Sequence, residues 1–266
     1  MSKIIIHGGF FSESSTNIET KIAKQQALLR IVKDSYAYLQ NHSALETVVY
    51  AVSQLEDDEL FNAGIGSQIQ SDGKIRMSAS LMDGESQKMS GVINIEEVKN
   101  PILVAQVLMQ VDDRILGGSG ATNFARKYGF EPFSTEIPQR RAEYEAKLAS
   151  LGTGTVGCVA LDNNGKIAVA TSTGGKGFEI PGRISDSATV AGNYANEFCG
   201  VSLTGVGEDI VSNATAAKIV TRVTDGFSIE KAFEKTFAEL KPYDGFAGAI
   251  GIDKQGNIFH QDSHPS

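Results

Sequence analysis

Two threonines stand at the ends of apolar runs, where a hydroxyl group can act on a substrate. Thr155 directly follows Gly154 and precedes the apolar residues 156–161. Thr173 lies 18 residues further on, at the end of a second small and apolar run. A threonine hydroxyl is a poor nucleophile near neutral pH and needs a neighbouring group to activate it. The pair suggests a nucleophile, Thr155, with Thr173 as its polar support; an ordinary β-branched strand residue is the alternative for a lone threonine.

Charged residues that suit an amino-acid ligand follow soon afterwards. Arg183 and Asp186 lie close together in the segment from Pro181 to Ser187. A guanidinium group binds a carboxylate through two parallel hydrogen bonds, whereas a carboxylate pairs with an ammonium group. The two side chains therefore predict a clamp for an amino acid, with a surface ion pair between them as the alternative.

Helical patterns that could position these residues fill much of the N-terminal half. Apolar side chains recur at spacings of three, four and seven, as on one face of a helix, at Ile22, Leu29, Val32, Tyr36 and Leu39. Ser43 and Glu46 form a capping box that begins a second helix. Asn100 and Pro101 predict the cap and first turn of another helix.

Strand patterns are separated by turns that contain glycine. The apolar runs 156–161 and 246–251 consist of small residues throughout, as in central strands that are covered on both faces. The sequence therefore predicts an α+β protein with sheets inside and helices outside. The predicted turns are Asp72-Gly73, Asn164-Gly165 and Gln255-Gly256.

Composition limits the classes of partner. The 266 residues, 41% of them hydrophobic, are enough for one large globular domain, residues 1–266. A net charge of −8 argues against nucleic acid as a partner, because nucleic-acid affinity rests largely on Lys and Arg. Cys158 and Cys199 sit in apolar runs, which favours buried thiols in a reducing compartment. With no signal-peptide core and no long apolar run, we expect a cytoplasmic protein without a membrane partner.

One segment is more polar than the rest. Residues 130–154 carry prolines and charged side chains and then loosen into small residues before Thr155. An exposed helix and mobile linker is the plain interpretation. A linker that ends at Gly154-Thr155 is also a place where the chain can be cut.

Three other motifs lack the context that their chemistry requires. Residues 152–157 match a G-x-G-x-x-G string, but the string opens a strand rather than a helix, which disfavours a dinucleotide site. Residues 117–120 are glycine-rich, yet no Walker lysine follows them. The four histidines have no metal-ligand spacing.

The chain resembles the plant-type asparaginase and isoaspartyl peptidase family, the threonine members of the N-terminal nucleophile hydrolases. The resemblance covers almost the whole chain and keeps the family's order and spacing. The matching segments are residues 6–9 (IHGG), 55–66 (LEDDELFNAGIG), 79–84 (ASLMDG), 99–102 (KNPI) and the blocks around Thr155, Thr173, Arg183, Asp186 and Thr204.

The resemblance implies a four-layer αββα sandwich that cleaves itself. Thr155 would attack the Gly154 carbonyl, giving an α chain of residues 1–154 and a β chain of residues 155–266. The freed α-amine, with an ordinary pKa of about 7.7–8.0, would then serve as the base for the Thr155 hydroxyl. The implied activity is hydrolysis of β-aspartyl dipeptides and, more weakly, of L-asparagine, without a catalytic cofactor.

Residue roles carry over position by position. Arg183 would hold the substrate α-carboxylate and Asp186 the α-ammonium. Thr204 and Gly205 match the pair that stabilises the oxyanion, and Gly207 shapes the same pocket; a plain glycine turn is the alternative. Thr173 would bond near Thr155, and Asn62 would help to position the nucleophile. The family's sodium loop, which braces the site through backbone carbonyls, corresponds to Leu55, Glu56, Asp58, Phe61, Ala63 and Ile65.

The chain departs from the family pattern near the clamp and at the C-terminus. Glu179 stands where the family commonly has lysine, so a cationic leaving group such as the arginine of β-Asp-Arg, a product of cyanophycin breakdown, would be favoured. A solvated loop glutamate is the alternative. Residues 258–266 lack the family's usual asparagine-threonine and glycine-methionine pattern, so one wall of the pocket is expected to differ.

The resemblance also implies a homodimer of αβ units. Two other functions remain open from the sequence. A glycosylasparaginase is disfavoured by the Thr173-Gly174-Gly175 sequence and by the lack of tryptophan. A binding protein that never matures would not need a nucleophile, its support and a clamp together.

Overall fold

The computed structural model describes residues 1–9, 18–146, 154–243 and 246–264. Its strands form a six-stranded sheet in the order β1-β5-β6-β2-β3-β4 and a four-stranded sheet in the order β10-β9-β8-β7. The strands are β1 (Lys3–His7), β2 (Met77–Asp83), β3 (Lys88–Ile95), β4 (Ile115–Gly117), β5 (Val156–Leu161), β6 (Ile167–Thr173), β7 (Asn193–Ala195), β8 (Cys199–Gly205), β9 (Ala247–Asp253) and β10 (Ile258–Asp262). The helices are α1 (Ile18–Leu39), α2 (Ala44–Glu56), α3 (Pro101–Leu108), α4 (Gly118–Lys127), α5 (Pro138–Glu145), α6 (Gly207–Asn213), α7 (Thr215–Thr224) and α8 (Ile229–Ala238), with 3₁₀ turns η1 (Asp186–Ala188) and η2 (Lys241–Tyr243).

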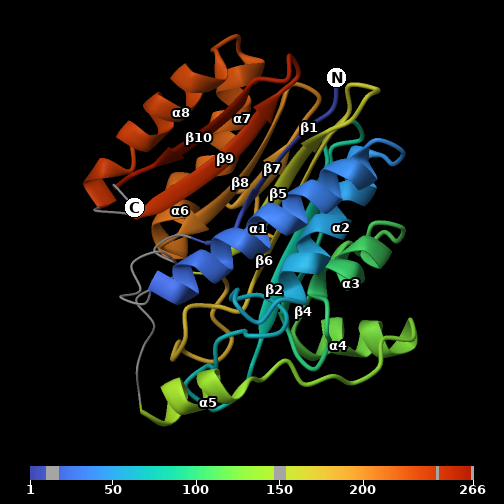
Figure 1. Cartoon of the computed structure of the whole chain (residues 1–266), viewed down its shortest axis with the longest axis vertical. Helices are drawn as coiled ribbons and strands as arrows, with labels where there is room; N and C mark the ends of the chain where they lie inside the picture. The colour runs from blue at the N-terminus through green and yellow to red at the C-terminus, as the bar shows by residue number, and fades with distance from the viewer. Residues whose placement is uncertain (10–17, 147–153, 244–245, 265–266) are drawn as a thin grey trace.

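The two sheets face each other, and helices cover their outer faces (Figure 1). Helices α1, α2 and α3 pack on the larger sheet, while α7 and α8 pack on the smaller one. Side chains from both sheets fill the space between them, including Val159 and Val169 from the larger sheet and Ile252 from the smaller one. The protein is therefore a mixed α and β fold with its sheets inside, as the sequence predicts.

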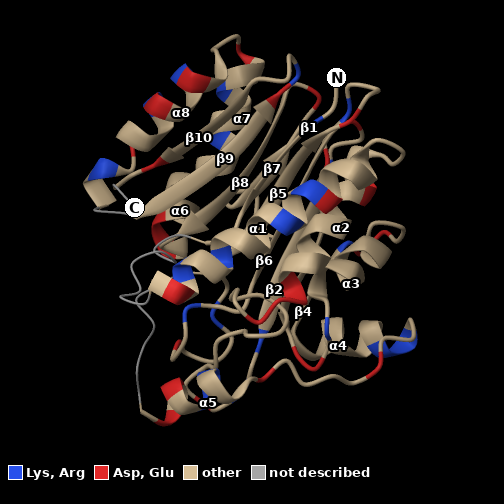
Figure 2. Ribbon diagram, viewed as in Figure 1, with Lys and Arg blue, Asp and Glu red and all other residues tan. Residues whose placement is uncertain are grey.

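Charged side chains are concentrated outside the central strands. Figure 2 shows Lys, Arg, Asp and Glu on the helices and loops, with most of the strand surface uncharged. Strands β5 and β6 are buried along their whole length. This follows from their small apolar residues, which pack against helices on one side and the second sheet on the other.

The predicted helices are present, with two differences in detail. Ser43 and Glu46 form the predicted capping box at the start of α2. Helix α1 contains the predicted residues, but Ile22, Leu29 and Tyr36 are exposed, and the buried face includes Ile31 and Leu39. Asn100 precedes α3, yet its side chain makes no cap bond and donates to the Ser53 carbonyl, because the neighbouring end of α2 offers an acceptor.

The predicted turns at 164–165 and 255–256 join hairpins β5–β6 and β9–β10. The third predicted turn, at Asp72-Gly73, closes through a bond from the Gly73 amide to the Gln70 carbonyl, but strands do not flank it directly. Strand β9 extends beyond the predicted range 246–251, since its pairing with β10 continues to Ile252 and its pairing with β8 to Asp253.

The polar segment before Thr155 contains the exposed helix α5, which has no buried residue. Residues 147–153 of the predicted linker lie outside the described residues. Among the described helices, none combines the length and the apolar character that crossing a membrane requires.

Candidate active site

The C-terminal ends of β1, β6 and β8 and the N-terminal end of β5 lie at the same end of the two sheets. Antiparallel pairing places the end of β1 beside the start of β5, and Val156 opposite Ser172 of β6. This register brings Thr155 next to Thr173. The Thr155 Oγ1 donates a hydrogen bond to Thr173 Oγ1 over 3.2 Å, and both side chains are buried.

A loop holding Asn62 braces this pair. The Gly175 amide donates to Thr173 Oγ1 over 3.2 Å, and Asn62 Nδ2 donates to the Gly175 carbonyl over 2.5 Å. A β-carbon at Gly154 would lie 2.6 Å from the Asn62 Cβ, so glycine is needed there for close packing. Asn62 therefore touches both the residue before Thr155 and the loop after Thr173.

A buried polar column lies between the sheets behind Thr155. His7 Nε2 is 2.9 Å from Ser202 Oγ, which is 2.7 Å from Thr171 Oγ1. Thr171 Oγ1 in turn donates to Asn193 Oδ1 over 3.0 Å. Burial lowers the pKa of His7 to about 4, although a hydrogen bond with the Thr155 backbone acts in the opposite direction. The imidazole beside Thr155 is thus uncharged at neutral pH.

Arg183 is held by Glu208 rather than by Asp186. Its Nε and Nη2 donate to the two Glu208 carboxylate oxygens, each over 3.0 Å, and Lys176 Nζ lies 3.2 Å from the same carboxylate. Partial burial acts to raise the pKa of Glu208, but the hydrogen bonds and charge of Arg183 outweigh it and lower the value to about 2. The Arg183 guanidinium group therefore already binds a carboxylate, that of Glu208, in the way that the sequence predicts for the carboxylate of a substrate.

Asp186 lies in η1, which packs against β2, β6 and α6. A β-carbon at Gly207 would be 2.7 Å from Arg183 Nη2 and 2.9 Å from Asp186 Oδ1, so both charged groups border this glycine. Burial raises the pKa of Asp186 to about 7, although the positive charge of Arg183 acts to lower it. Ser80 Oγ anchors η1 to β2 by donating to the Ser187 carbonyl over 2.6 Å.

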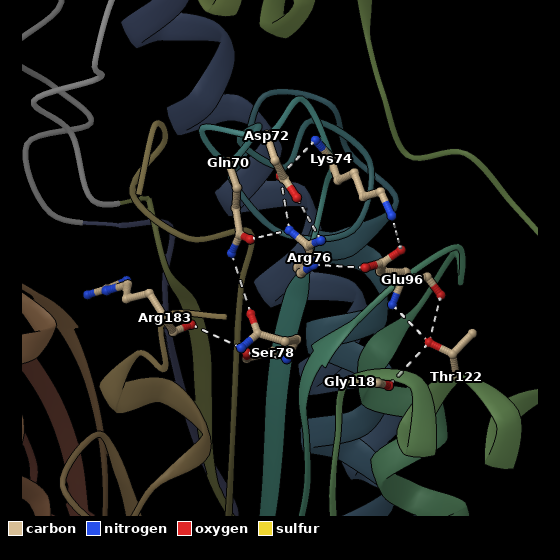
Figure 3. A network of polar contacts seen from close by, with 10 residues as sticks. Gln70, Asp72, Lys74, Arg76, Ser78, Glu96, Gly118, Thr122 and Arg183 are labelled. Carbon is tan, nitrogen blue, oxygen red and sulfur yellow. Dashed lines mark hydrogen bonds and ion pairs between the residues drawn. The ribbon is translucent and has the colours of Figure 1, made fainter. Parts of the chain in front are cut away.

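The backbone of Arg183 is fixed from the larger sheet (Figure 3). Asn94 Nδ2 donates to the Arg183 carbonyl over 3.1 Å and Gln70 Nε2 to Asn94 Oδ1 over 3.4 Å. Arg76 Nη1 donates to Gln70 Oε1 over 2.6 Å, and Arg76 Nε donates to Glu96. The Arg183 side chain points away from this network in Figure 3, which leaves its guanidinium group for Glu208.

Thr204 and Gly205 are the last residues of strand β8, at the same end of the sheets as Thr155. Gly205 has a φ of +145°, and the backbone of Phe246 and Ala247 occupies the place of a β-carbon, so only glycine fits. The alternative of a plain turn does not describe this strand residue. Thr204 lines a cavity of about 300 Å³ together with His7.

Glu179 is buried, with 5% of its surface exposed, so it is not the solvated loop glutamate of the alternative. Its Oε1 lies against Gly175, and its Oε2 has no hydrogen-bonding partner among the described residues. The side chain thus belongs to the loop that also contacts Asn62 and Thr173.

The predicted sodium loop closes on itself through backbone groups. The Ile65 amide donates to the Glu56 carbonyl over 2.7 Å, and the Phe61 amide donates to the Asp58 carbonyl over 3.1 Å. A carbonyl has two lone pairs, so these two oxygens each retain one for another ligand. Leu55, Phe61 and Ala63 are buried.

Comparisons with known proteins identify the family of the chain. A family model described as asparaginase matches residues 1–264. An isoaspartyl peptidase/L-asparaginase of Synechocystis is 45% identical, over 96% of this chain and 83% of its own length. The isoaspartyl peptidase of Escherichia coli is 36% identical (96% and 88%), and the plant-type L-asparaginase of Pyrococcus furiosus is 35% identical (97% and 92%).

The chain belongs to the asparaginase family. The predicted resemblance is therefore confirmed, and these relatives carry the names of hydrolases. Within this family member the structure brings Thr155, Thr173 and Asn62 together, and separately groups Arg183, Asp186 and Gly207.

Sequence reasoning assigned no role to three buried or half-buried side chains of this asparaginase-family site. His7 lies in the IHGG segment and Glu208 follows Gly207, so their places in family segments could have indicated a role in the site. The Glu56 carboxyl was not singled out. It accepts hydrogen bonds from Ser172 Oγ over 2.6 Å and from the Ile102 amide over 3.1 Å, and burial raises its pKa to about 8 despite these bonds.

Proposed function

We propose that the protein is a self-processing amidohydrolase that cleaves β-aspartyl dipeptides and, more weakly, L-asparagine. The observation that carries the proposal is the hydrogen bond between the buried hydroxyl groups of Thr155 and Thr173, in a chain of the asparaginase family. Arg183 and Asp186, which both border Gly207, supply the two charges that a free aspartyl backbone requires.

Turnover proceeds by acyl transfer. The Thr155 oxygen attacks the side-chain carbonyl carbon of the substrate, and its proton passes to the α-amine that cleavage has freed. Thr204 and the Gly205 amide stabilise the oxyanion, an effect worth about 3 kcal/mol for each donor. The C–N bond then breaks, the leaving amine takes the proton, and water hydrolyses the ester to release aspartate.

Self-cleavage uses the same hydroxyl. Thr155 attacks the Gly154 carbonyl carbon, the peptide bond becomes an ester, and water hydrolyses that ester to leave residues 1–154 and 155–266. The packing of Asn62 against Gly154 supports this step, because it holds the carbonyl-bearing residue close to the nucleophile. The order of helices and sheets supports the four-layer αββα sandwich that the family resemblance implies.

A cationic leaving residue, as in β-Asp-Arg, is part of the proposal. The carboxyl group of Glu179, whose Oε1 lies against Gly175, supports it, and the preference for β-Asp-Arg over β-Asp-Leu should then fall in Glu179→Lys. A structural sodium ion on the carbonyls of residues 55–65 is supported by the closed loop there, and it would stiffen the segment that carries Asn62. A cytoplasmic homodimer of αβ units completes the proposal.

Release of aspartate tests the function. Purified wild-type protein should release aspartate from β-Asp-Leu, β-Asp-Arg and asparagine. Thr155→Ala should be at least about a thousandfold slower, because the nucleophile is lost. Thr221→Ala, at an exposed threonine of α7, is the matched control and should retain activity. Wild-type protein that releases no aspartate from any of the three substrates would contradict the proposal.

A further inference from the structure

The smaller sheet carries a row of three residues that begins in the candidate site. Thr204 is paired with Gly248, and Gly248 is paired on its other side with Asp262 of β10. Directly paired residues of neighbouring strands point to the same face of a sheet. Because Gly248 has no side chain, nothing of this row stands between the side chains of Thr204 and Asp262.

A second row fixes which face this is. Ser202 is paired with Ile250, and Ile250 with His260. Ser202 contacts His7 of the larger sheet, and Ile250 belongs to the apolar cluster between the sheets. Residues two apart along a strand share a face. Thr204, Gly248 and Asp262 therefore also face the larger sheet.

All residues of these rows except Ser202 form one wall of the cavity of about 300 Å³ noted above. Ile5, Ile6 and His7 of β1 form the opposite wall, with Gly9 beyond them. We call this space the leaving-group groove. It begins at Thr204 and runs across Gly248 to the edge strand β10, where His260 and Asp262 line it.

The direction of the bound substrate follows from the order of its groups. In the proposed function Arg183 and Asp186, which border Gly207, bind the α-carboxylate and the α-ammonium, and Thr204 stabilises the oxyanion of the reacting carbonyl. The leaving amine is attached to that carbonyl on the side away from the aspartyl α-carbon. We propose that the leaving residue of a β-aspartyl dipeptide occupies the leaving-group groove, with a cationic side chain directed at Asp262. The inference rests on the proposed function.

The dimensions and charges of the groove suit arginine or lysine. Two strand spacings separate Thr204 from Asp262, about 10 Å, which a long side chain spans. His7 is uncharged at neutral pH, and the lining also contains the titratable side chains of His260 and Asp262. Among the described residues that line the groove, Asp262 is the only acidic one. Asparagine, which releases ammonia, does not fill this space.

Kinetics with three substrates test the groove. Asp262→Asn should lower kcat/KM for β-Asp-Arg about fivefold to tenfold, as loss of one half-exposed ion pair allows, while β-Asp-Leu and asparagine change less than about twofold. Asp262→Arg should disfavour β-Asp-Arg further. Asp225→Asn, which removes the same charge from an exposed position at the end of α7, should change none of the three.

Three results would overturn the inference. One is an equal change for all three substrates in Asp262→Asn, which would indicate a general structural role. Another is no change for any of them. The third is a preference for β-Asp-Arg that disappears in Glu179→Lys but persists in Asp262→Asn. If wild-type protein hydrolyses no substrate, the proposed function fails instead; binding of β-Asp-Arg that is unaffected by Asp262→Asn would then overturn the groove as well.

Discussion

The two halves of the candidate site are built from different interactions. The nucleophile half, Asn62, Thr155 and Thr173, is buried and joined by hydrogen bonds between uncharged groups. The clamp half, Arg183, Asp186 and Glu208, consists of charged groups. The Thr155 hydroxyl must be oriented before the substrate binds, whereas Arg183 must exchange its bond to Glu208 for a bond to the substrate. We therefore expect the nucleophile half to serve both self-cleavage and turnover, and the clamp half to serve turnover alone.

Arg183→Ala should separate the two halves most strongly. Loss of two charge-assisted hydrogen bonds to the substrate carboxylate should lower kcat/KM by about 10²–10³-fold. Self-cleavage at Gly154 should proceed at the wild-type rate, because the Arg183 guanidinium group bonds to Glu208 and borders Gly207, away from the hydrogen bonds that hold Thr155. Steady-state kinetics and gel analysis measure the two effects, with Arg183→Lys as the charge-retaining control. Loss of cleavage in Arg183→Ala would contradict the division.

Thr173→Val should damage both processes. The hydroxyl that accepts from Thr155 and from the Gly175 amide is replaced by a methyl group of similar size. Self-cleavage and turnover should both slow by about 10–100-fold, as expected when a buried hydrogen bond to the nucleophile is lost. Thr173→Ser, which keeps the hydroxyl, should recover most of both rates. A variant that slows turnover alone would place Thr173 in the clamp half.

The pH profile distinguishes the halves by their titratable groups. Asp186, with a pKa of about 7, must be ionised to hold the substrate ammonium, and the freed Thr155 amine, with a pKa of about 7.7–8.0, must be deprotonated. The kcat/KM for asparagine should therefore fall about hundredfold per pH unit below both values. In Asp186→Asn the residual activity should fall only about tenfold per unit. Identical slopes in the two proteins would exclude Asp186 as the second group.

The raised pKa also has a consequence for stability. A carboxyl whose pKa is higher in the folded state than its ordinary 3.8 stabilises the fold most at low pH. This contribution is lost as the pH rises from about 4 to about 7. Denaturant unfolding of wild type and Asp186→Asn across that range measures it.

Glu208→Gln should have the smallest effect. Glu208 competes for the Arg183 guanidinium, but its side chain is 51% exposed, and such ion pairs contribute about 0–1 kcal/mol. The KM should fall by less than about fivefold with kcat nearly unchanged. A large rise in KM would mean that Glu208 positions Arg183 instead of competing with the substrate.

The sequence predicts the nucleophile half better than the clamp half. Thr155 precedes β5 and Thr173 ends β6, and the small apolar residues of both strands predict that the strands are buried. The β5–β6 hairpin then places the two threonines side by side. The partner of Arg183 depends on how α6 packs against η1, a contact between segments that no local pattern specifies. The sequence therefore predicted Asp186, three residues away, as the alternative partner.

Burial explains the remaining differences. The period in α1 predicts a helix but not which residues face the sheet, because apolar residues occur on both sides, and Leu29 is exposed as a result. Glu179 is charged and lies in a loop, yet it folds inward against Gly175. The leaving-group groove depends on the pairing of β8, β9 and β10, and the sequence showed only that residues 258–266 differ from the family.

Intact-mass analysis of purified wild type beside Thr155→Ala tests the central claim, that Thr155 becomes the N-terminal nucleophile of the chain. After incubation, wild type should give two fragments, residues 1–154 and 155–266, while Thr155→Ala should stay whole. Fragments from Thr155→Ala, or a wild-type chain that stays whole yet releases aspartate, would contradict the account.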